Sequence, residues 1–310
     1  MEAYFQHRFI PLSEARLSVM THALHYGTAC FEGIRGNWNR EEDRTYLFRS
    51  REHYQRLARS CQLIKIDLPY TIDELCDITV DLVARNGFHE DIYIRPLAYK
   101  SSEAIGVRLH DLEDDLLMFA VPFGPYLDVD KGVKCCISSW VRINDNMIPS
   151  AAKVSGRYVN SALAKTEALE KGFDETIMLT SQGYVSEGSG ENVFIFYHGK
   201  LITPPSSDDI LIGITRDSVI RLAQEELGIS TLERSVSRSD LYSASECFLT
   251  GTAAHITPVV EIDHYRIEEG RVGEVTRKLA DIYFDVIYGR NPRYSSWLTP
   301  VEKKITKSVS

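Results

Sequence analysis

The chain has 310 residues, of which 44% are hydrophobic and 25% are charged, and its formal net charge at pH 7 is -9. This length allows a substantial core and two compact domains, and the composition is that of an ordinary globular protein. An acidic chain without a long basic tract argues against nucleic-acid binding, because phosphate backbones attract clustered Lys and Arg. We therefore expect small-molecule partners, with no nucleic acid and no membrane.

The start of the chain and its cysteines give no sign of export. Residues 1–8 lack the apolar region of a signal peptide, and no apolar run approaches the roughly 20 residues of a membrane-spanning helix. The six cysteines form no CxxC pair, and the nine dispersed histidines form no HExxH motif. The adjacent Cys135 and Cys136 lie in an apolar run, which suits buried thiols. The sequence therefore predicts a cytoplasmic protein without a metal site.

The first 120 residues follow an α+β pattern. Ser50 is expected to cap a helix that has one apolar face. Thr71 and Glu74 have the spacing of a capping box before a second amphipathic helix. The apolar stretches expected to form strands are 46–48, 92–94 and 116–121.

Residues 122–131 carry two prolines and a glycine between strand-like runs, as expected of an interdomain linker. The predicted domains are a small N-terminal one (1–121) and a larger C-terminal one (132–310).

Helices and hairpins are predicted to alternate in the C-terminal part. One helix over 158–171 should end at Gly172, and another over about 216–227 should end at Gly228, because glycine is favoured just past a helix end. Turn signals between these helices favour hairpins. The last dozen residues are polar and expected to be frayed. The other expected elements are strands at 133–138, 247–250 and 257–262 and a helix at 275–288.

Lys153 is the first candidate for covalent chemistry. An enzyme that binds a carbonyl group as a Schiff base needs a lysine with a lowered pKa. Most lysines of the chain lie among charged residues or at turn tips, whereas Lys153 has small, uncharged neighbours over 148–156. Such neighbours let an aromatic ring approach the side chain and limit local solvation. Taken alone, the pattern is equally that of a solvated loop lysine.

Glu187 lies in the glycine-rich segment Tyr184-Val-Ser-Glu-Gly-Ser-Gly-Glu-Asn-Val193. A glutamate between a strand and glycines can face a pyridine nitrogen and keep it protonated, which makes the ring an electron sink. The alternative for an isolated glutamate is a surface turn with solvated carboxylates.

Three further features suit a phosphate group. Residues 211–217 open a helix with a glycine and a threonine, where backbone N–H groups can face an anion; an ordinary N-cap by Thr215 is the alternative. Residues 249–254 follow a strand with small residues and amides, or form only a tight turn. Arg49 follows a strand and can bind phosphate through two donors, or be solvated.

These features occur with others in a fixed order along the chain. The segments are Tyr26-Gly27, Phe31-Glu-Gly-Ile-Arg35, Arg95-Pro96, Ser150-Ala-Ala-Lys153, Ser186-Glu-Gly-Ser-Gly-Glu-Asn192, Gly213-Ile-Thr-Arg216 and Gly251-Thr-Ala-Ala254. The set resembles the branched-chain aminotransferases, which belong to fold type IV of the pyridoxal-phosphate-dependent enzymes. The resemblance runs from about residue 22 to about residue 288, and Phe-Glu-Gly-Ile-Arg with Tyr-Ile-Arg-Pro points to the branched-chain subgroup.

The resemblance implies a two-domain α+β fold similar to that of the D-amino-acid transaminases. The small N-terminal domain would be α/β, and the larger C-terminal domain would hold pyridoxal 5'-phosphate on a β-barrel-like sheet. The implied reaction is transamination of leucine, isoleucine and valine with 2-oxoglutarate by a ping-pong mechanism.

The resemblance also implies a role for each cofactor-site residue. Lys153 would form the Schiff base and shuttle the proton, and Glu187 would pair with the pyridine nitrogen. Tyr158 would lie near the ring hydroxyl, and Leu211 would pack against one face of the ring. The phosphate and its surroundings would be bound by Arg49, Gly213, Ile214, Thr215 and Thr252.

On the substrate side, the resemblance implies a carboxylate site at the turn formed by Thr252, Ala253 and Ala254, with Tyr26 and Arg95 nearby. The apolar pocket would be walled by Phe31, Phe123 and Tyr158. Tyr126, on the linker, would reach the site of a neighbouring subunit, which implies a homodimer or a higher homo-oligomer.

Two departures from the family pattern bear on the substrate. Phe123 stands where many close relatives have tryptophan, and the segment 99–106 differs from the glycine-rich loop expected there. A transaminase of D-amino acids or (R)-amines with the same fold is therefore the alternative. An aminodeoxychorismate lyase fits the motifs less well. From another class, a non-catalytic binding protein with a decayed site is disfavoured, because the expected cofactor positions carry competent residue types.

Overall fold

The computed structural model describes residues 1–124 and 127–302 of the chain. These residues form two compact units. The first contains 1–124, 152–156 and the described residues from 285 onward, and the second contains the described residues of 125–151 together with 157–284. The first unit is therefore assembled from three separate stretches of sequence. The predicted domain limits remain a prediction.

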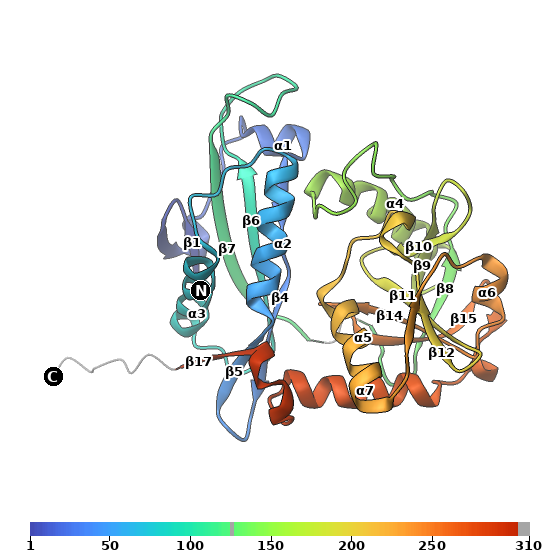
Figure 1. Cartoon of the computed structure of the whole chain (residues 1–310). Coiled ribbons are helices and arrows are strands. Elements are labelled where there is room, and N and C mark those ends of the chain that lie inside the picture. The colour runs from blue at the N-terminus through green and yellow to red at the C-terminus, as the bar shows by residue number, and fades with distance from the viewer. Residues whose placement is uncertain (125–126, 303–310) are drawn as a thin grey trace. The chain divides into compact units, whose positions relative to one another are not determined.

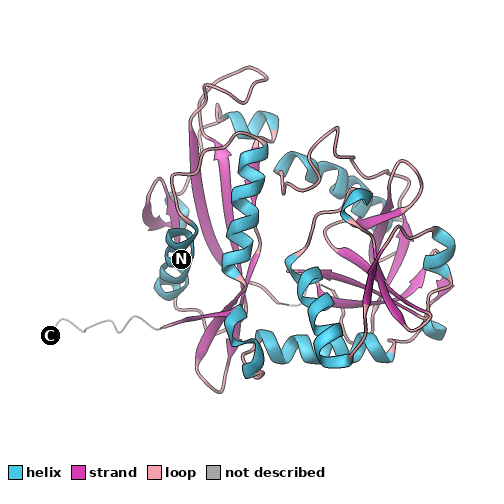
Figure 2. Cartoon of the chain, viewed as in Figure 1, coloured by secondary structure: helices cyan, strands magenta, loops and turns pink. Residues whose placement is uncertain are grey.

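The first unit is built on an antiparallel sheet of eight strands (Figures 1 and 2). The strand order is β17-β5-β4-β6-β7-β1-β2, and β3 pairs with β6. The elements of this unit are β1 (Glu2–Phe5), β2 (Arg8–Pro11), α1 (His22–Tyr26), β3 (Ala29–Phe31), β4 (Ile34–Asn39), β5 (Arg44–Phe48), α2 (Ser50–Leu63), α3 (Ile72–Asn86), β6 (Ile92–Lys100), β7 (Asp114–Pro122) and β17 (Leu298–Val301).

Helices α2 and α3 pack together on one face of this sheet (Figure 1). Tyr54 of α2 and Thr79 of α3 both contact the sulfur of Met118 on β7, at 3.5 and 3.7 Å. Because side chains alternate between the faces of a strand, this apolar face also carries Ile94 on β6. The opposite face carries the residues in between, including Arg95.

The two predicted helix starts had different outcomes. The capping box of Thr71 and Glu74 at the start of α3 is confirmed. The prediction that Ser50 caps α2 is wrong. Arg49 is the cap residue, with a left-handed φ of 50°, and Ser50 is already helical. A tertiary contact explains the difference, because the Arg49 N–H donates a hydrogen bond to the carbonyl of Trp297 at 2.7 Å.

The expectation of a frayed C-terminus is also wrong for the residues that the structure describes there. Leu298–Val301 form β17, which pairs with β5 in antiparallel register. The side chain of Ser50 adds a contact of 3.2 Å to Thr299 of this strand. The strand was not predicted because the segment is polar. A strand at the edge of a sheet pairs on one side only, so it can form without an apolar sequence. Residues 303–310 lie outside the described part.

The second unit is built on a nine-stranded sheet that closes on itself (Figures 1 and 2). Six strands, in the order β8-β9-β10-β11-β14-β15, form the closed barrel, because β10 pairs with β11 and β15 pairs with β8. The elements are β8 (Val133–Ile137), α4 (Tyr158–Glu170), β9 (Glu175–Leu179), β10 (Val185–Gly188), β11 (Asn192–Tyr197), β12 (Lys200–Thr203), α5 (Ile214–Leu227), β13 (Thr231–Glu233), α6 (Arg238–Tyr242), β14 (Glu246–Gly251), β15 (His255–Ile262), β16 (Tyr265–Arg266) and α7 (Glu274–Ile287).

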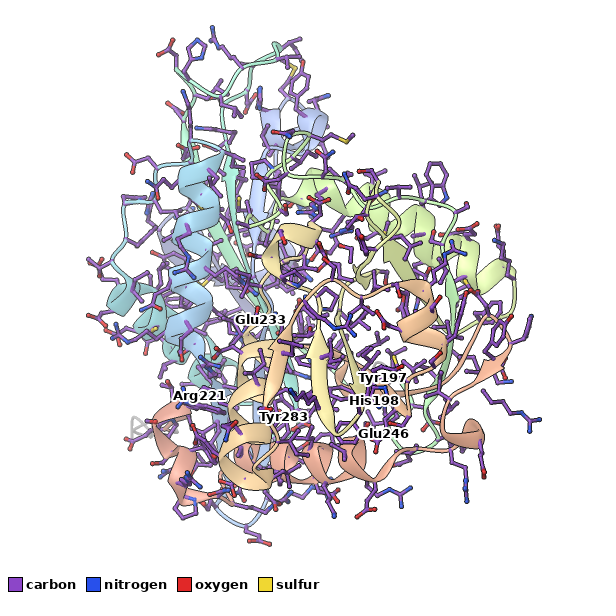
Figure 3. The ribbon with its side chains drawn as sticks, turned by 45° about the vertical axis from the view of Figure 1, so that its right-hand side comes forward. Tyr197, His198, Arg221, Glu233, Glu246 and Tyr283 are labelled. Atoms are coloured by element: carbon purple, nitrogen blue, oxygen red, sulfur yellow. The ribbon has the colours of Figure 1, made fainter. Side chains whose placement is uncertain are left out.

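The core of the second unit is mostly aliphatic, and a buried carboxylate binds the start of α7. Glu246 of β14 accepts hydrogen bonds from the backbone of Val275 and Thr276 at 3.0 and 2.7 Å (Figure 3). A carboxylate at this position satisfies N–H groups that a helix leaves unpaired at its start. Side chains that fill the core include Val133, Ile177, Val193, Leu249 and Val259. Within the described residues, no helix is both long and apolar enough to cross a membrane.

Candidate active site

Lys153 lies in the first unit, although the residues on either side of 152–156 in sequence belong to the second. Its N–H donates to the hydroxyl of Ser60 on α2 at 3.1 Å, and its carbonyl accepts from the Phe31 N–H at 3.1 Å. Val154 adds a backbone bridge to Cys30 on β3. The side chain is half-buried, with Nζ 4.9 Å from the centre of the Phe31 ring. Backbone bonds on both sides therefore fix the main chain from which this side chain extends.

A buried ionic cluster lies on the neighbouring residues of the same unit. Both oxygens of Glu32 accept from the guanidinium of Arg56, at 2.7 and 2.8 Å, and His53 Nδ1 lies 2.7 Å from Oε2. Burial favours the neutral form of Glu32, but the charges of Arg56 and His53 outweigh it and hold its pKa well below the usual range. Burial lowers the pKa of His53.

Ser60 connects this cluster to Lys153. Its hydroxyl donates to the carbonyl of Arg56 at 2.9 Å and accepts from the N–H of Lys153. None of His53, Arg56 and Ser60 was predicted from the sequence. A signal existed, because these polar residues interrupt the apolar face predicted for the first helix, and a buried charge needs a reason.

Arg49 lies seven residues before Arg56, at the start of the same helix. Its Nε donates to Glu52 at 2.8 Å, and its guanidinium carbon lies 4.9 Å from the centre of the Trp297 ring. Arg49 is therefore occupied at the C-terminal segment, whereas Arg56 belongs to the cluster that Ser60 joins to Lys153.

Three of the predicted substrate residues are brought together on the sheet of the first unit. The guanidinium carbon of Arg95 lies 4.4 Å from the Phe31 ring centre, and Tyr93 connects Arg95 to Phe123. The hydroxyl of Tyr26 accepts a hydrogen bond from the Gly106 N–H at 3.1 Å. Tyr126 falls outside the described residues.

Glu187, at the end of β10, is held on both carboxylate oxygens within the second unit. Oε1 lies 2.6 Å from the guanidinium of Arg142, and Oε2 accepts from the Leu211 N–H at 2.9 Å and, weakly, from Asn192 at 3.4 Å. Arg142 supplies a counter-charge inside the protein, where an isolated carboxylate would be costly. Arg142 was not predicted, because it lies in an irregular stretch without a recognisable motif.

The second glutamate of the same motif has a different environment. Glu191 is buried, and burial together with the neighbouring carboxylate of Glu175 raises its pKa to about 8. Glu175 is paired with Lys165 at 2.6 Å. A carboxyl that retains its proton near neutral pH cannot stabilise a positive charge, so Glu187 is the member of the motif suited to a protonated ring nitrogen.

The start of α5 lies next to Glu187. Asn192 donates to the carbonyl of Leu211 at 2.8 Å, and its side-chain oxygen occupies the space where Gly213 would carry a Cβ. Glycine is therefore required at the first turn, and within the described residues no side chain caps this helix. The predicted phosphate residues Ile214 and Thr215 form its first buried turn.

The predicted turn at Thr252 follows β14, which pairs with the strand that carries Asn192. Thr250 pairs with Asn192 across β14 and β11, and its buried hydroxyl has no hydrogen-bond partner among the described residues. The carbonyl of Ala254 accepts from Thr257 at 2.7 Å, which fixes the turn that contains Thr252 and Ala253.

Tyr158 is the first residue of α4 and is half-buried. The preceding Arg157 is fully buried and donates to the carbonyls of Ile143 and Asp209, at 3.1 and 2.6 Å. Burial and the neighbouring Arg142 lower the pKa of Arg157. Arg157 therefore ties the start of α4 to the chain that leads to Leu211.

These residues fit pyridoxal 5'-phosphate. The second unit gathers a charged carboxylate for the ring nitrogen, an uncapped helix start for the phosphate and an orphaned hydroxyl beside it. The first unit offers a half-buried lysine beside an aromatic ring. The groups of the second unit suit the basic nitrogen and the phosphate of such a cofactor, and the lysine of the first unit suits its aldehyde.

Comparison with known proteins agrees with this chemistry. The family model of amino-transferase class IV matches residues 29–262. A curated relative from Aquifex aeolicus, called "Probable branched-chain-amino-acid aminotransferase", is 49% identical over 302 residues, covering 97% of each chain. The branched-chain aminotransferase of Thermoproteus uzoniensis, solved with norvaline, has a TM-score of 0.93 and 45% identity, covering 97% of this chain and 99% of its own.

A second solved structure adds the cofactor. The T.th. branched-chain amino acid aminotransferase, complexed with N-(5'-phosphopyridoxyl)-L-glutamate, has a TM-score of 0.92 and 41% identity, covering 97% of this chain and 98% of its own. Fold and sequence thus define a fold type IV transaminase. The chain belongs to the class IV aminotransferases, which use pyridoxal 5'-phosphate. The predicted family, fold class, enzyme class and cofactor are confirmed.

The buried carboxylate of Glu32 predicts an acid-sensitive contribution to stability. Because its pKa in the folded protein is below the ordinary value of 4.5, the stabilisation is present above pH 4.5 and is lost as the pH falls further. Glu32→Gln should lower the free energy of unfolding by about 3 kcal/mol at neutral pH, since Arg56 loses its counter-charge.

Urea titrations at several pH values measure this difference. It should shrink below pH 4.5, and a difference that stayed constant with pH would contradict the assigned ionic state. The exposed control Glu14→Gln should change the free energy by less than about 0.5 kcal/mol.

Proposed function

We propose that this class IV aminotransferase transfers the amino group between branched-chain L-amino acids and 2-oxoglutarate, with Lys153 as the Schiff-base lysine. The observation that carries the proposal is the fixed, half-buried amine of Lys153, which is bonded through its backbone to Ser60 and Phe31. The names of the relatives support leucine, isoleucine and valine as substrates, and the glutamate adduct of the T.th. enzyme supports glutamate and 2-oxoglutarate as the second pair.

The bound cofactor supplies an electron sink for negative charge at the substrate Cα. The ε-amine of Lys153 removes the Cα proton in one half-reaction and returns it in the other. The carboxylate of Glu187 would keep the ring nitrogen of the bound cofactor positively charged, because Arg142 and the Leu211 N–H hold Glu187 in place. One site serves both substrates in turn, so the kinetics are ping-pong.

Substrate selection depends on a mixture of apolar and cationic groups. Phe31 and Phe123 offer apolar walls for an aliphatic side chain, with which a site separates homologues by about 1–3 kcal/mol per methylene. Glutamate must fit in the same site, and Arg95 with Tyr26 would receive its distal carboxylate. The turn at 252–254 would receive the carboxylate next to Cα.

Two arginines at the start and in the middle of one helical segment, Arg49 and Arg56, are candidates for binding the phosphate. Arg56 is buried and lies one turn before Ser60, whose hydroxyl accepts from the backbone of Lys153. Arg49 packs on Trp297 instead. We therefore assign the phosphate to Arg56, together with the start of α5 and Thr252, and regard Arg49, the arginine expected from the sequence, as the alternative.

The enzyme would act as a homodimer. In the first unit, α1 and the segment 102–107 lie side by side, joined by a bridge between Thr21 and Glu103 and by the contact of His22 with the Gly106 carbonyl. Contiguous apolar surface of this kind marks an interface. The exposed apolar side chains on these segments and on the residues just before α1 are Leu17, Val19, Met20, Leu24, Ile105 and Val107.

The cytoplasm is the proposed location. All six cysteines are free thiols, and five of them are buried. Buried unpaired thiols suit a reducing compartment, because oxidising ones favour disulfides.

Replacement of Lys153 tests the central assignment. Lys153→Ala should lower kcat for leucine by more than about 10⁴-fold, because the general base is lost. The purified variant should also lack the yellow colour of the covalently bound cofactor. Retained colour and turnover would remove the assignment.

The same assay identifies the substrate class. The unaltered enzyme should use L-leucine in preference to D-alanine and (R)-1-phenylethylamine. A preference for either of the last two would favour the alternative transaminase.

The two arginines of the helix give a matched pair. Arg56→Gln should weaken binding of pyridoxal 5'-phosphate by about 10- to 100-fold, because charge-assisted bonds to phosphate contribute about 1.5–3 kcal/mol each. Arg49→Gln should change the affinity by less than about threefold. Fluorescence titration of the apoenzyme measures both. The reverse order would restore Arg49 as the phosphate residue.

Charge placed on the apolar surface should separate the subunits. The double variant Val19→Glu with Val107→Glu should sediment as a monomer in analytical ultracentrifugation, because carboxylates are costly to bury. Leu232→Glu, at an exposed leucine of the second unit, should leave the oligomer intact. An unchanged oligomer in the double variant would place the interface elsewhere.

A further inference from the structure

A row of cationic and aromatic side chains extends from Lys153 along the first unit to the end of β7. Each member contacts the next through a ring face or edge, and all members belong to the first unit. In order, the row consists of Lys153, Phe31, Arg95, Tyr93, Phe123 and Arg35. Arg35, the last member of the row, has no part in the chemistry described above.

The middle of the row is closely fitted. The guanidinium carbon of Arg95 lies 4.4 Å from the Phe31 ring centre and 5.1 Å from that of Tyr93, and its Nη2 donates to the Tyr93 hydroxyl at 2.9 Å. A Cβ at Gly33 would overlap that hydroxyl. Glycine at position 33 therefore makes room for the orientation of Tyr93.

Arg35 holds its neighbour in the row, Phe123. Its two terminal nitrogens donate to the carbonyl of Phe123 at 2.5 Å and to that of Gly124 at 3.3 Å. Its guanidinium carbon also lies 4.9 Å from the Phe123 ring centre. Arg35 itself is buried on β4, paired in register with Tyr93. One side chain thus binds the backbone and the ring of Phe123.

Phe123 is held from the other sides as well. Its N–H donates to the carbonyl of Asp91 at 2.9 Å, and its ring centre lies 5.3 Å from that of Tyr93. Asp91 is fixed in turn by the Trp38 N–H and the Tyr288 hydroxyl, at 2.8 and 2.6 Å. Phe123 is therefore restrained at its N–H, its carbonyl and its ring.

We propose that Arg35 is a positioning residue that holds Phe123 as a rigid wall of the substrate pocket and so sets the discrimination among aliphatic side chains. The inference rests on the proposed function through the role of Phe123. If the ring of Phe123 could move, the pocket would bind aliphatic side chains of several sizes with similar affinity. A fixed ring instead lowers the affinity for side chains that are too small to fill the pocket. A planar guanidinium suits the task, because two donors and a stacking face act together.

The restraint itself is testable without substrate. Arg35→Lys keeps the charge but cannot bind both carbonyls and stack at once. Hydrogen exchange at the Phe123 amide should accelerate by about tenfold or more, because local opening becomes easier. The readout is local, since Pro122 and Pro125 carry no amide proton. Arg85→Lys, which removes a similar contact over Phe9, is the matched control and should leave this amide unchanged.

Kinetics then test the consequence for specificity. In Arg35→Lys, the ratio of kcat/KM for L-leucine over L-alanine should fall by about fivefold, chiefly through KM for leucine, while kcat with glutamate stays within about twofold. Binding of 4-methylpentanoate, which is leucine without its amino group, should weaken to the same extent in calorimetry. A purely structural defect would instead lower all rates together.

Two outcomes overturn the inference: unchanged exchange at Phe123, or faster exchange with an unchanged substrate ratio. Phe123→Leu provides a second variant if Arg35→Lys does not fold, and it should lower the same ratio while the amide stays protected. Failure of the proposed function looks different, because the unaltered enzyme would then not use leucine, and the exchange result would still report on the restraint.

Discussion

The position of the Lys153 amine depends on two backbone hydrogen bonds, one to the hydroxyl of Ser60 and one from the N–H of Phe31. A reactive lysine must be reachable by an aldehyde and must also be held, because a freely rotating amine spends most of its time in unproductive orientations. The protein meets both needs by fixing the main chain and leaving the side chain half-buried.

Each of the two buried carboxylates discussed above lies next to a basic side chain. Glu32 is balanced by Arg56 and His53 in the first unit, and Glu187 is balanced by Arg142 in the second. Such sets contribute little net stability, because desolvation offsets attraction, but removal of one partner leaves a costly isolated charge. They therefore specify the geometry of a site more than they stabilise the fold.

Much of the proposed cofactor site follows from local signatures of its residues. Glycines next to Glu187, a glycine at the start of α5 and a lysine among small residues each make chemical sense at short range. Arg49 shows the limit of this reasoning. From the sequence, two arginines of one helix are equivalent, and only the packing of Trp297 on one and of Glu32 on the other distinguishes them.

The main helices, several strands and the family could be predicted from the sequence, because helix caps, apolar periodicity and glycine-rich motifs act over a few residues. Tertiary structure alone decided that residues 152–156 and the strand at 298–301 join the first unit, and that Arg35 holds Phe123. The physical reason is that such contacts join residues far apart in sequence. The free energy of these contacts comes from the exclusion of water and from the pairing of hydrogen-bond donors with acceptors where the two segments meet. The composition of either segment alone encodes neither.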